Sequence, residues 1–156
     1  MPVAGLFGSD LPQASGFRTV ADPYTGEPVY VMPRLAPDWA VLHVHEADEL
    51  GNAHIWGTPY WDRLMSRAAE RLILTAERIV PTAEFVRCPE LTVVPAFLVD
   101  AVVEAPGGAW PGSCHPCYGV DEAAVWDYLQ HSHDAGWLSG HLSNAERGVR
   151  NAGQRG

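Results

Sequence analysis

Leu42–Gly57, with the sequence LHVHEADELGNAHIWG, decides the fold of this chain. Apolar and β-branched residues predict strands over 39–47 and 53–57, and the acidic segment 48–52 between them ends in Gly-Asn, which is typical of a turn. The stretch also holds three of the seven histidines of the chain. Two interpretations of this stretch therefore remain: a strand-turn-strand of an α/β sheet, and a metal-binding strand pair.

Outward from this stretch, helix and strand signals alternate. We expect a helix over 60–71, because its apolar residues fall on one face, and then strands within 72–75 and 91–103, the second interrupted at Pro95. A loop is expected over 106–119, followed by a helix that Asp121 caps and Gly136 ends. This alternation predicts an α/β domain with a largely parallel or mixed sheet. The density of proline and glycine predicts irregular chain over 1–28.

The composition excludes several classes of partner and chemistry. The chain has 156 residues and a formal charge of −9, with nineteen acidic residues against ten basic ones. All the basic residues are arginine, so no lysine Schiff base can form, and the negative charge disfavours nucleic acid and anionic membranes. No apolar run is long enough to span a bilayer, no signal peptide is visible, and three cysteines do not suggest a disulfide framework. We therefore expect a cytoplasmic protein with reduced thiols.

Two motifs suggest metal ligands. His43, His45 and Glu49 have the His-x-His-x₃-Glu spacing of the first cupin metal motif, but Pro37 replaces its usual glycine and no second motif follows. Cys114–Cys117 is a C-x-x-C that would need two further ligands to hold zinc. We expect histidines that line a pocket or the core, a cysteine pair in a loop, and no metal site.

Two carboxylates and a histidine pair complete the polar features. Asp100 and Glu104 lie in an apolar run, where a carboxylate needs a partner, and a structural role is favoured over a catalytic one. His131 and His133 lie near the end of the last expected helix, where they suit the helix dipole. Gly107-Gly108 alone is weak support for phosphate binding.

Five stretches in one order resemble the alpha (A) subunit of family I CoA-transferases. This family includes glutaconate and 3-oxoacid CoA-transferases and the related ring-opening CoA hydrolases of steroid breakdown. The most specific of the five are the stretch 47–57, which contains the Ala-Asp-x-x-Gly-Asn turn, and the long stretch 95–118. The resemblance spans about residues 2–130, and the five stretches are 2–11, 22–29, 47–57, 76–82 and 95–118.

The resemblance implies part of an open, largely parallel sheet with flanking helices. Alpha subunits of the family are longer, and Met1 lies where their domain is already half complete. The first parallel strands and a glycine-rich loop of the family are therefore expected to be missing. We accordingly expect a partial domain over 1–142 and a polar, disordered tail over 143–156.

The resemblance also implies a function. A CoA-transferase moves CoA between an acyl-CoA and a carboxylic acid through a glutamyl-CoA intermediate, whose glutamate belongs to the beta subunit. This chain then carries no catalytic residue, is inactive without partner chains, and uses CoA as a substrate and not as a cofactor. The expected partners are a beta-like subunit and, as an alternative, a separate chain with the N-terminal half of alpha. A ring-opening hydrolase subunit, a non-catalytic assembly subunit and a cupin-like metal enzyme remain alternatives.

The residues expected to contact substrate lie in a turn and in a glycine-rich loop. Such segments at strand ends are where α/β sheets bind ligands. A second explanation for the glycine at position 51 is that the turn requires a positive φ there. Trp110 differs from many relatives, which have histidine at that position. The candidate substrate-binding residues are Asp48, Gly51, Asn52, Gly108, Ser113, Cys114 and Tyr118.

Overall fold

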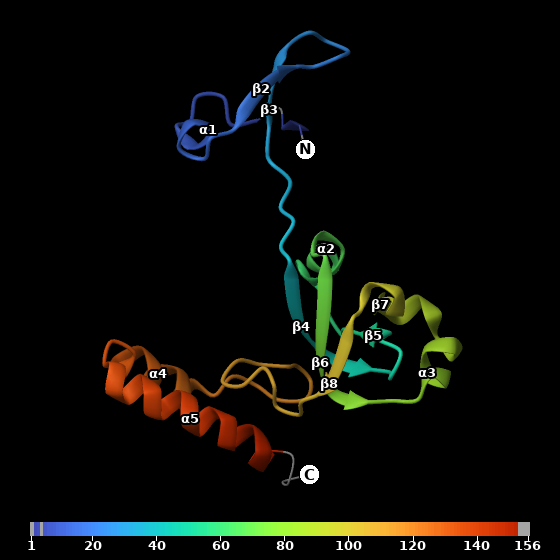
Figure 1. Ribbon diagram of the computed structural model, residues 1–156, viewed down its shortest axis with the longest axis vertical. Helices are drawn as coiled ribbons and strands as arrows, with labels where there is room; N and C mark the ends of the chain where they lie inside the picture. The colour runs from blue at the N-terminus through green and yellow to red at the C-terminus, as the bar shows by residue number, and fades with distance from the viewer. Residues whose placement is uncertain (1, 4, 153–156) are drawn as a thin grey trace. The chain divides into compact units, whose positions relative to one another are not determined.

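The computed structural model describes residues 2–3 and 5–152 (Figure 1). The chain forms two compact units, residues 1–36 and 37–156. The sequence predicted one partial domain over 1–142, and this boundary stays a prediction. Each unit is described by itself below.

The first unit is a small antiparallel sheet with the strand order β1-β3-β2. Its strands are β1 (Pro2–Val3), β2 (Arg18–Ala21) and β3 (Pro28–Val31), and α1 (Leu11–Ala14) precedes β2. A turn joins β2 to β3, in which Asp22 Oδ1 accepts the N–H groups of Tyr24 and Thr25 at 2.8 and 2.9 Å. The prolines and glycines of this region therefore delimit short strands, where irregular chain was predicted up to residue 28.

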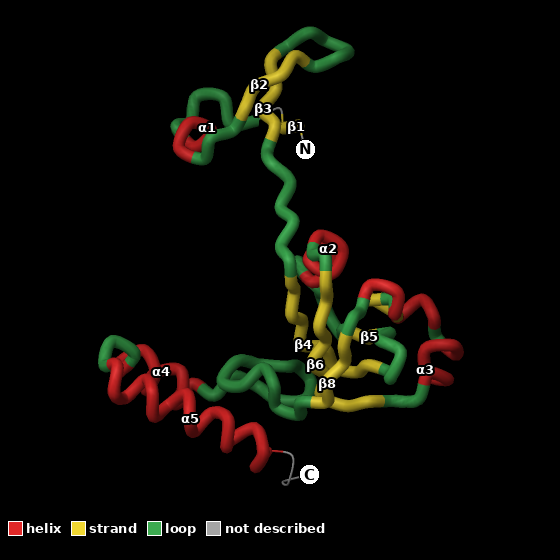
Figure 2. The backbone as a smooth tube through the Cα atoms, viewed as in Figure 1, coloured by secondary structure: helices red, strands yellow, loops and turns green. Residues whose placement is uncertain are grey.

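The second unit is built on a five-stranded sheet with the order β7-β5-β4-β6-β8 (Figure 2). The strands β4 (Trp39–Ala47), β6 (Arg71–Ile79) and β8 (Ala101–Glu104) run parallel. The short strands β5 (Ala53–His54) and β7 (Thr92–Val94) are antiparallel to their neighbours. The structure thus confirms the predicted α/β fold with a largely parallel sheet, and the predicted break of the last apolar run at Pro95.

Short helices join these strands. They are α2 (Asp62–Ala68), α3 (Thr82–Arg87) and the 3₁₀ turns Pro89–Leu91 and Ala96–Leu98. The predicted helix over 60–71 is shorter than expected because Arg71 already belongs to β6, where it pairs with Trp39.

Two longer helices, α4 (Glu122–His131) and α5 (Ala135–Ala152), follow the loop after β8. Asp121 caps α4 as predicted, since its Oδ1 accepts the N–H of Ala124 at 3.0 Å. The prediction that Gly136 ends the last helix is wrong. Asp134 Oδ1 accepts the N–H of Trp137 at 2.7 Å, so a new helix begins there. Its backbone stays helical to Ala152, within the segment predicted to be a disordered tail, and residues 153–156 lie outside the described chain.

Side chains alternate between the two faces of the sheet and give the faces different characters. One face carries the apolar core, to which β4 and β6 contribute every second residue. The opposite face is polar where β4 and β6 end, because His43 pairs in register with Thr75 there. The buried core residues are Ala40, Leu42, Val44, Ala47, Ala53, Leu72, Leu74, Ala76 and Val94.

No helix of the described residues is long and apolar enough to cross a membrane.

Candidate functional site

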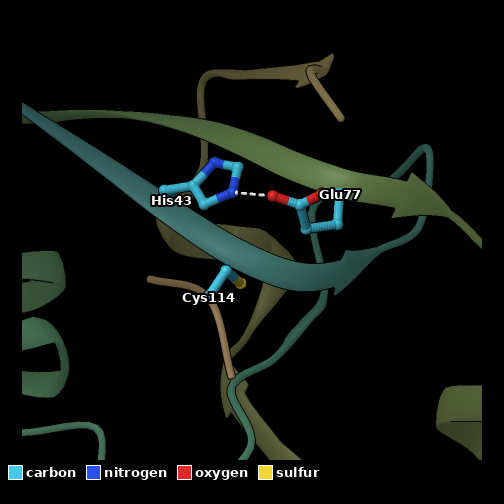
Figure 3. Close-up of side chains that lie close together, drawn as sticks. All are labelled: His43, Glu77 and Cys114. Carbon is cyan, nitrogen blue, oxygen red and sulfur yellow. Dashed lines mark hydrogen bonds and ion pairs between the residues drawn. The ribbon is translucent and has the colours of Figure 1, made fainter. Parts of the chain in front are cut away.

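The polar face of the sheet carries a cluster centred on Glu77. His43, from β4, directs Nε2 to Glu77 Oε1 at 2.6 Å (Figure 3). The Nδ1 of His43 lies 2.9 Å from Thr75 Oγ1. The two side chains of the His43–Glu77 pair are only 17% and 10% exposed. Burial of this pair shields its interaction from water and strengthens it.

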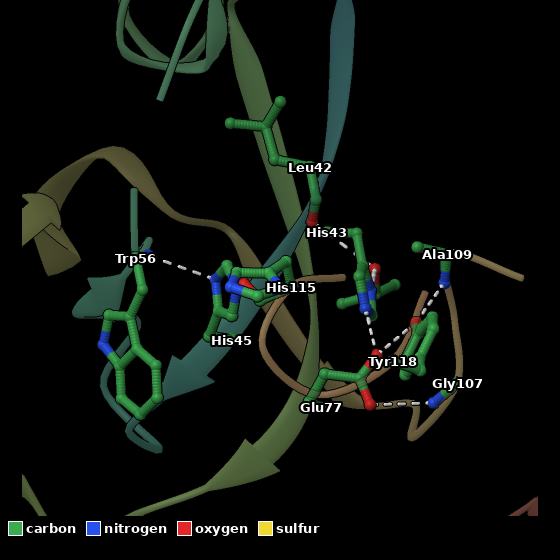
Figure 4. A network of polar contacts seen from close by, with 10 residues as sticks. Leu42, His43, His45, Trp56, Glu77, Gly107, Ala109, His115 and Tyr118 are labelled. Atoms are coloured by element: carbon green, nitrogen blue, oxygen red, sulfur yellow. Dashed lines mark hydrogen bonds and ion pairs between the residues drawn. The ribbon is translucent and has the colours of Figure 1, made fainter. Parts of the chain in front are cut away.

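Glu77 also fastens the loop between β8 and α4, residues 105–121, to the sheet. Gly107 N–H donates to Glu77 Oε2 at 2.8 Å, and the Tyr118 hydroxyl donates to Glu77 Oε1 at 2.6 Å (Figure 4). The oxygen of Tyr118 in turn accepts the N–H of Ala109 at 2.9 Å. One carboxylate therefore holds both ends of this loop.

These contacts determine the protonation of the cluster. Burial raises the pKa of Glu77, but the hydrogen bonds from Tyr118, Gly107 and His43 outweigh it and leave the pKa below its ordinary value. Burial and the bond to Glu77 raise the pKa of Tyr118, so its hydroxyl stays a donor. Burial, with the nearby charge of Glu77, raises the pKa of the Cys114 thiol to about 11. The resting cluster is a carboxylate surrounded by donors.

Two further loop residues pack against the cluster. Cys114 is buried, and its Sγ lies within 4.8 Å of ligand atoms of both His43 and Glu77. A Cβ at Gly108 would lie 2.7 Å from His43 Cε1 and 2.9 Å from the carbonyl oxygen of Ala105. Gly108 is therefore required for the close approach of the backbone to the imidazole.

His45 makes a second contact between β4 and the same loop. Its Nε2 lies 2.7 Å from the carbonyl oxygen of His115, and its Nδ1 accepts the N–H of Trp56 at 3.2 Å (Figure 4). The ring also stacks on Trp56 with centroids 5.5 Å apart. His43 and His45 thus contact neighbouring side chains and the loop, as the structural interpretation predicted. Glu49 instead lines a pocket with residues 79–82.

The turn after β4 forms a separate, self-contained unit. Asp48 is fully buried, and its Oδ1 accepts the N–H groups of Leu50, Gly51 and Asn52 at 3.1, 2.9 and 2.8 Å. Asn52 bonds the other carboxylate oxygen at 2.9 Å and accepts the N–H of Ala96 at 3.0 Å. Gly51 has φ +103°, and a Cβ there would lie 2.7 Å from Val99 Cβ. This turn therefore anchors the chain between β7 and β8.

The structure divides the predicted substrate-binding residues into two groups. Gly108, Cys114 and Tyr118 meet around His43 and Glu77, while Ser113 is exposed in the same loop. The turn residues Asp48, Gly51 and Asn52 use their polar groups internally. Substrate contact by either group stays a prediction.

Several functional candidates were not predicted from the sequence. Glu77 is the most important, and its signal was its spacing of two from Thr75, which places both on the face of β6 that adjoins His43. Glu46 is another, because it pairs with Arg78 and bonds His54 Nδ1 at 3.0 Å, and the Nε2 of that buried histidine has no partner among the described residues.

The carboxylates expected to be structural have backbone partners. Asp100 Oδ2 accepts the N–H of Leu72 at 2.8 Å, and Glu104 Oε1 accepts the N–H of Ile79 at 3.2 Å. Asp100, which precedes β8, and Glu104, which ends it, both bond to the backbone of β6, and this supports the structural interpretation. At the end of α4, His131 Nδ1 lies 3.0 Å from the carbonyl oxygen of Asp127, as expected of a histidine near a helix end.

The geometry favours positioning over covalent catalysis at Glu77. Its two oxygens already accept from a histidine, a tyrosine and a backbone amide, which stabilise the charge that a nucleophile would have to share with a carbonyl carbon. The cluster is suited to holding a glycine-rich loop at the carboxyl ends of parallel strands.

Comparison with known proteins identifies the family of this chain. The family model described as Coenzyme A transferase matches residues 11–105. The chain belongs to the coenzyme A transferase family. It resembles the alpha (A) subunit in particular: that of the glutaconate CoA-transferase of Acidaminococcus fermentans is 36% identical over 67% of this chain and 33% of its own length. The assignment confirms the resemblance inferred from sequence and replaces the cupin alternative.

A hydrolase subunit and a solved structure are also similar. The cholesterol ring-cleaving hydrolase IpdA subunit of Mycobacterium tuberculosis is 38% identical over 98% of this chain and 59% of its own length. The crystal structure of glutaconate CoA-transferase from Acidaminococcus fermentans aligns with a TM-score of 0.82 and 28% identity, over 92% of this chain and 51% of that one. The chain therefore spans less than two-thirds of the length of the curated relatives it matches.

Proposed function

We propose that this chain forms part of the alpha subunit of a CoA-transferase that moves CoA between an acyl-CoA and a carboxylic acid. In this proposal the reaction proceeds on a glutamate of a partner, beta-like chain. The carboxylate attacks the thioester carbonyl and releases CoA thiolate, and the thiolate then attacks the resulting anhydride to give glutamyl-CoA and the free acid. The carboxylate of the acceptor acid then attacks glutamyl-CoA, and the same steps in reverse order give the new acyl-CoA and the free glutamate.

The observation that carries the proposal is the loop that Glu77 holds at the carboxyl ends of β4 and β6. Gly107 and Tyr118 attach to the same carboxylate, so the glycine-rich segment has a fixed path. Ligands of open α/β sheets bind beside the carboxyl ends of the strands. The role proposed for this chain is to form a wall of the acyl-CoA site, with CoA as substrate.

The need for partner chains is supported by the edge of the sheet. Of the residues of β4, only Glu46 and Ala47 pair with β5, so the described structure gives residues 39–45 of β4 a ladder on the β6 side alone. Trp39 and Val41 on this segment are 48% and 59% exposed. An unpaired apolar strand is a site for pairing with other chain. The proposed partners are a beta-like chain and a polypeptide that supplies the part of the alpha subunit outside the matched region.

A second candidate function is a subunit of a hydrolase that opens a ring of a CoA ester. The similarity to the IpdA subunit favours it, because that match extends over 98% of this chain. The two functions differ in the fate of CoA. A transferase exchanges CoA between acids, whereas a ring-opening hydrolase adds water to the acyl group and leaves CoA attached.

Product analysis of the chain with and without its partners tests the proposal. We expect no turnover by the chain alone, since Glu77, the carboxylate beside the glycine-rich loop, already accepts hydrogen bonds from His43, Gly107 and Tyr118. With a beta-like chain and the remainder of the alpha subunit, isotope-labelled acetate should appear in acetyl-CoA when another acyl-CoA is supplied. Mass spectrometry of the CoA esters measures both outcomes.

A CoA ester that gains one water without label exchange would support the hydrolase instead. An assembled complex with neither activity would support the alternative of a non-catalytic assembly subunit, and exchange by the chain alone would contradict the proposal.

A further inference from the structure

The cluster on the polar face brings together donors that the sequence keeps far apart. His43 comes from β4, Glu77 from β6 and Cys114 from the loop 105–121, and their ligand atoms all lie within 4.8 Å of one another (Figure 3). Imidazole, carboxylate and thiolate are the three ligand types that zinc uses in proteins. The C-x-x-C motif needed two further ligands to hold zinc, and the fold supplies a histidine and a glutamate beside it.

The surroundings of these donors orient them as the outer shell of a metal site does. Thr75 Oγ1 lies 2.9 Å from His43 Nδ1 and 3.4 Å from the carbonyl oxygen of Leu42, to which its hydroxyl donates. When a metal takes the place of the Nε2 proton that Glu77 accepts in the resting cluster, the remaining ring proton of His43 lies on Nδ1, and Thr75 Oγ1 accepts it. A ligating histidine usually donates its other N–H in this way.

The carboxylate and the imidazole are also held in place from the loop. Tyr118 and Gly107 donate to Glu77, which fixes the plane of its carboxylate. Gly108 lets the backbone press against His43, because any Cβ there would lie 2.7 Å from Cε1. Outer contacts of this kind are a large part of the affinity of a metal site.

A fourth donor lies next to the three. Cys117 follows Cys114 by three residues and its thiol interacts with that of Cys114. The backbones of Cys114 and Tyr118 exchange two hydrogen bonds of 3.1 Å, so the segment turns back on itself around the two cysteines. Cys117 is exposed beside Cys114, whereas Cys88 lies in the segment between α3 and β7.

We propose that His43, Glu77 and Cys114, with Cys117 as fourth ligand, bind one zinc ion. Zinc prefers a tetrahedron of nitrogen, sulfur and oxygen ligands at roughly 2.0 to 2.3 Å. Binding replaces the direct His43–Glu77 contact and releases the thiol protons of Cys114 and Cys117 to solvent. The metal would fasten the loop 105–121 to β4 and β6, and the inference holds whichever reaction the assembled enzyme carries out.

Cobalt(II) substitution of the full, metal-depleted chain tests this inference by spectroscopy, without an activity assay. We expect one cobalt ion per chain, with thiolate-to-cobalt charge-transfer absorption and the visible bands of a tetrahedral site, both removed by one equivalent of zinc. His43→Ala and Cys114→Ser should each weaken zinc binding by more than the roughly 10- to 100-fold effect of a change outside the direct ligands. Competition with a chromophoric chelator measures that affinity.

Cys88→Ser is the matched control, because it removes a half-buried cysteine outside the cluster and should leave the spectrum unchanged. The wild-type titration alone can overturn the inference, so the test does not depend on the variants folding. Absence of a charge-transfer band, or a band of unchanged intensity in Cys114→Ser, contradicts the site. Loss of the band in Cys88→Ser assigns the metal to other residues and contradicts it as well.

Discussion

Asp48→Ala is expected to lower the free energy of unfolding by roughly 3 to 5 kcal/mol, the largest effect of any single substitution proposed for this chain. The carboxylate is fully buried and accepts three backbone N–H groups and the amide of Asn52. Alanine would leave these donors without partners and would release the turn that anchors the chain between β7 and β8. Chemical denaturation followed by far-ultraviolet circular dichroism measures the loss.

Glu49→Ala is the matched control, because Glu49 is the exposed neighbour in the same turn. It should change stability by less than about 0.5 kcal/mol. An equal effect of both substitutions would contradict the account of the turn.

The contribution of Asp48 should also depend on pH. Burial raises the pKa of Asp48, but hydrogen bonds from Asn52, Thr82 and Gly51 outweigh it and leave the pKa below its ordinary value. A carboxyl whose pKa is lower in the folded state stabilises the fold above its unfolded pKa, about 3.9 for aspartate. That stabilisation is lost as the pH falls from there through the folded value. The difference in the free energy of unfolding between wild type and Asp48→Ala should therefore be constant near neutral pH and become smaller in acid.

Glu77→Ala is expected to release the loop 105–121 and to cost roughly 2 to 4 kcal/mol, because hydrogen bonds to a charged group contribute about 1.5 to 3 kcal/mol each and partial exposure reduces their sum. His43, Tyr118 and Gly107 would all lose their acceptor. Hydrogen exchange at the amides of Gly107 and Ala109 should accelerate more than exchange within β4. The comparison is made with a chelator present, so that loss of a metal ligand does not contribute.

Glu70→Ala removes an exposed carboxylate that precedes β6 and serves as the control. Amide hydrogen exchange in the loop 105–121 of this variant should match that of wild type. If Glu77→Ala also leaves exchange in 105–121 unchanged, Glu77 does not hold the loop.

The sequence predicted the central sheet well because its signals are local. β-branched residues and the Gly-Asn turn placed 39–47 and the following turn, and Pro95 placed the break between β7 and β8. The helix start at Asp134 was missed because Gly136, two residues later, suggested a helix end. In the first unit, β2 and the turn after it were missed because the turn depends on the side chain of Asp22, while the glycines and prolines around it suggested irregular chain.

The candidate site was predictable only in part because its residues meet through strand register. His43, Cys114 and Tyr118 were each noted in the sequence, but nothing local connects them. Glu77 joins them once β6 pairs with β4 so that Thr75 lies beside His43. A one-residue shift in that register would turn Glu77 to the opposite face of the sheet. Long-range pairing therefore determines the cluster, and a single sequence does not specify it.

The central claim is that this chain serves a CoA-transferase whose catalytic carboxylate lies on a partner chain. Trapping the intermediate tests it most directly: the assembled complex is incubated with an acyl-CoA, treated with hydroxylamine, and each polypeptide is weighed intact and after digestion. We predict a glutamyl hydroxamate on the beta-like chain and none on residues 1–156. A hydroxamate or a CoA thioester on any glutamate of this chain, Glu77 above all, would contradict the account.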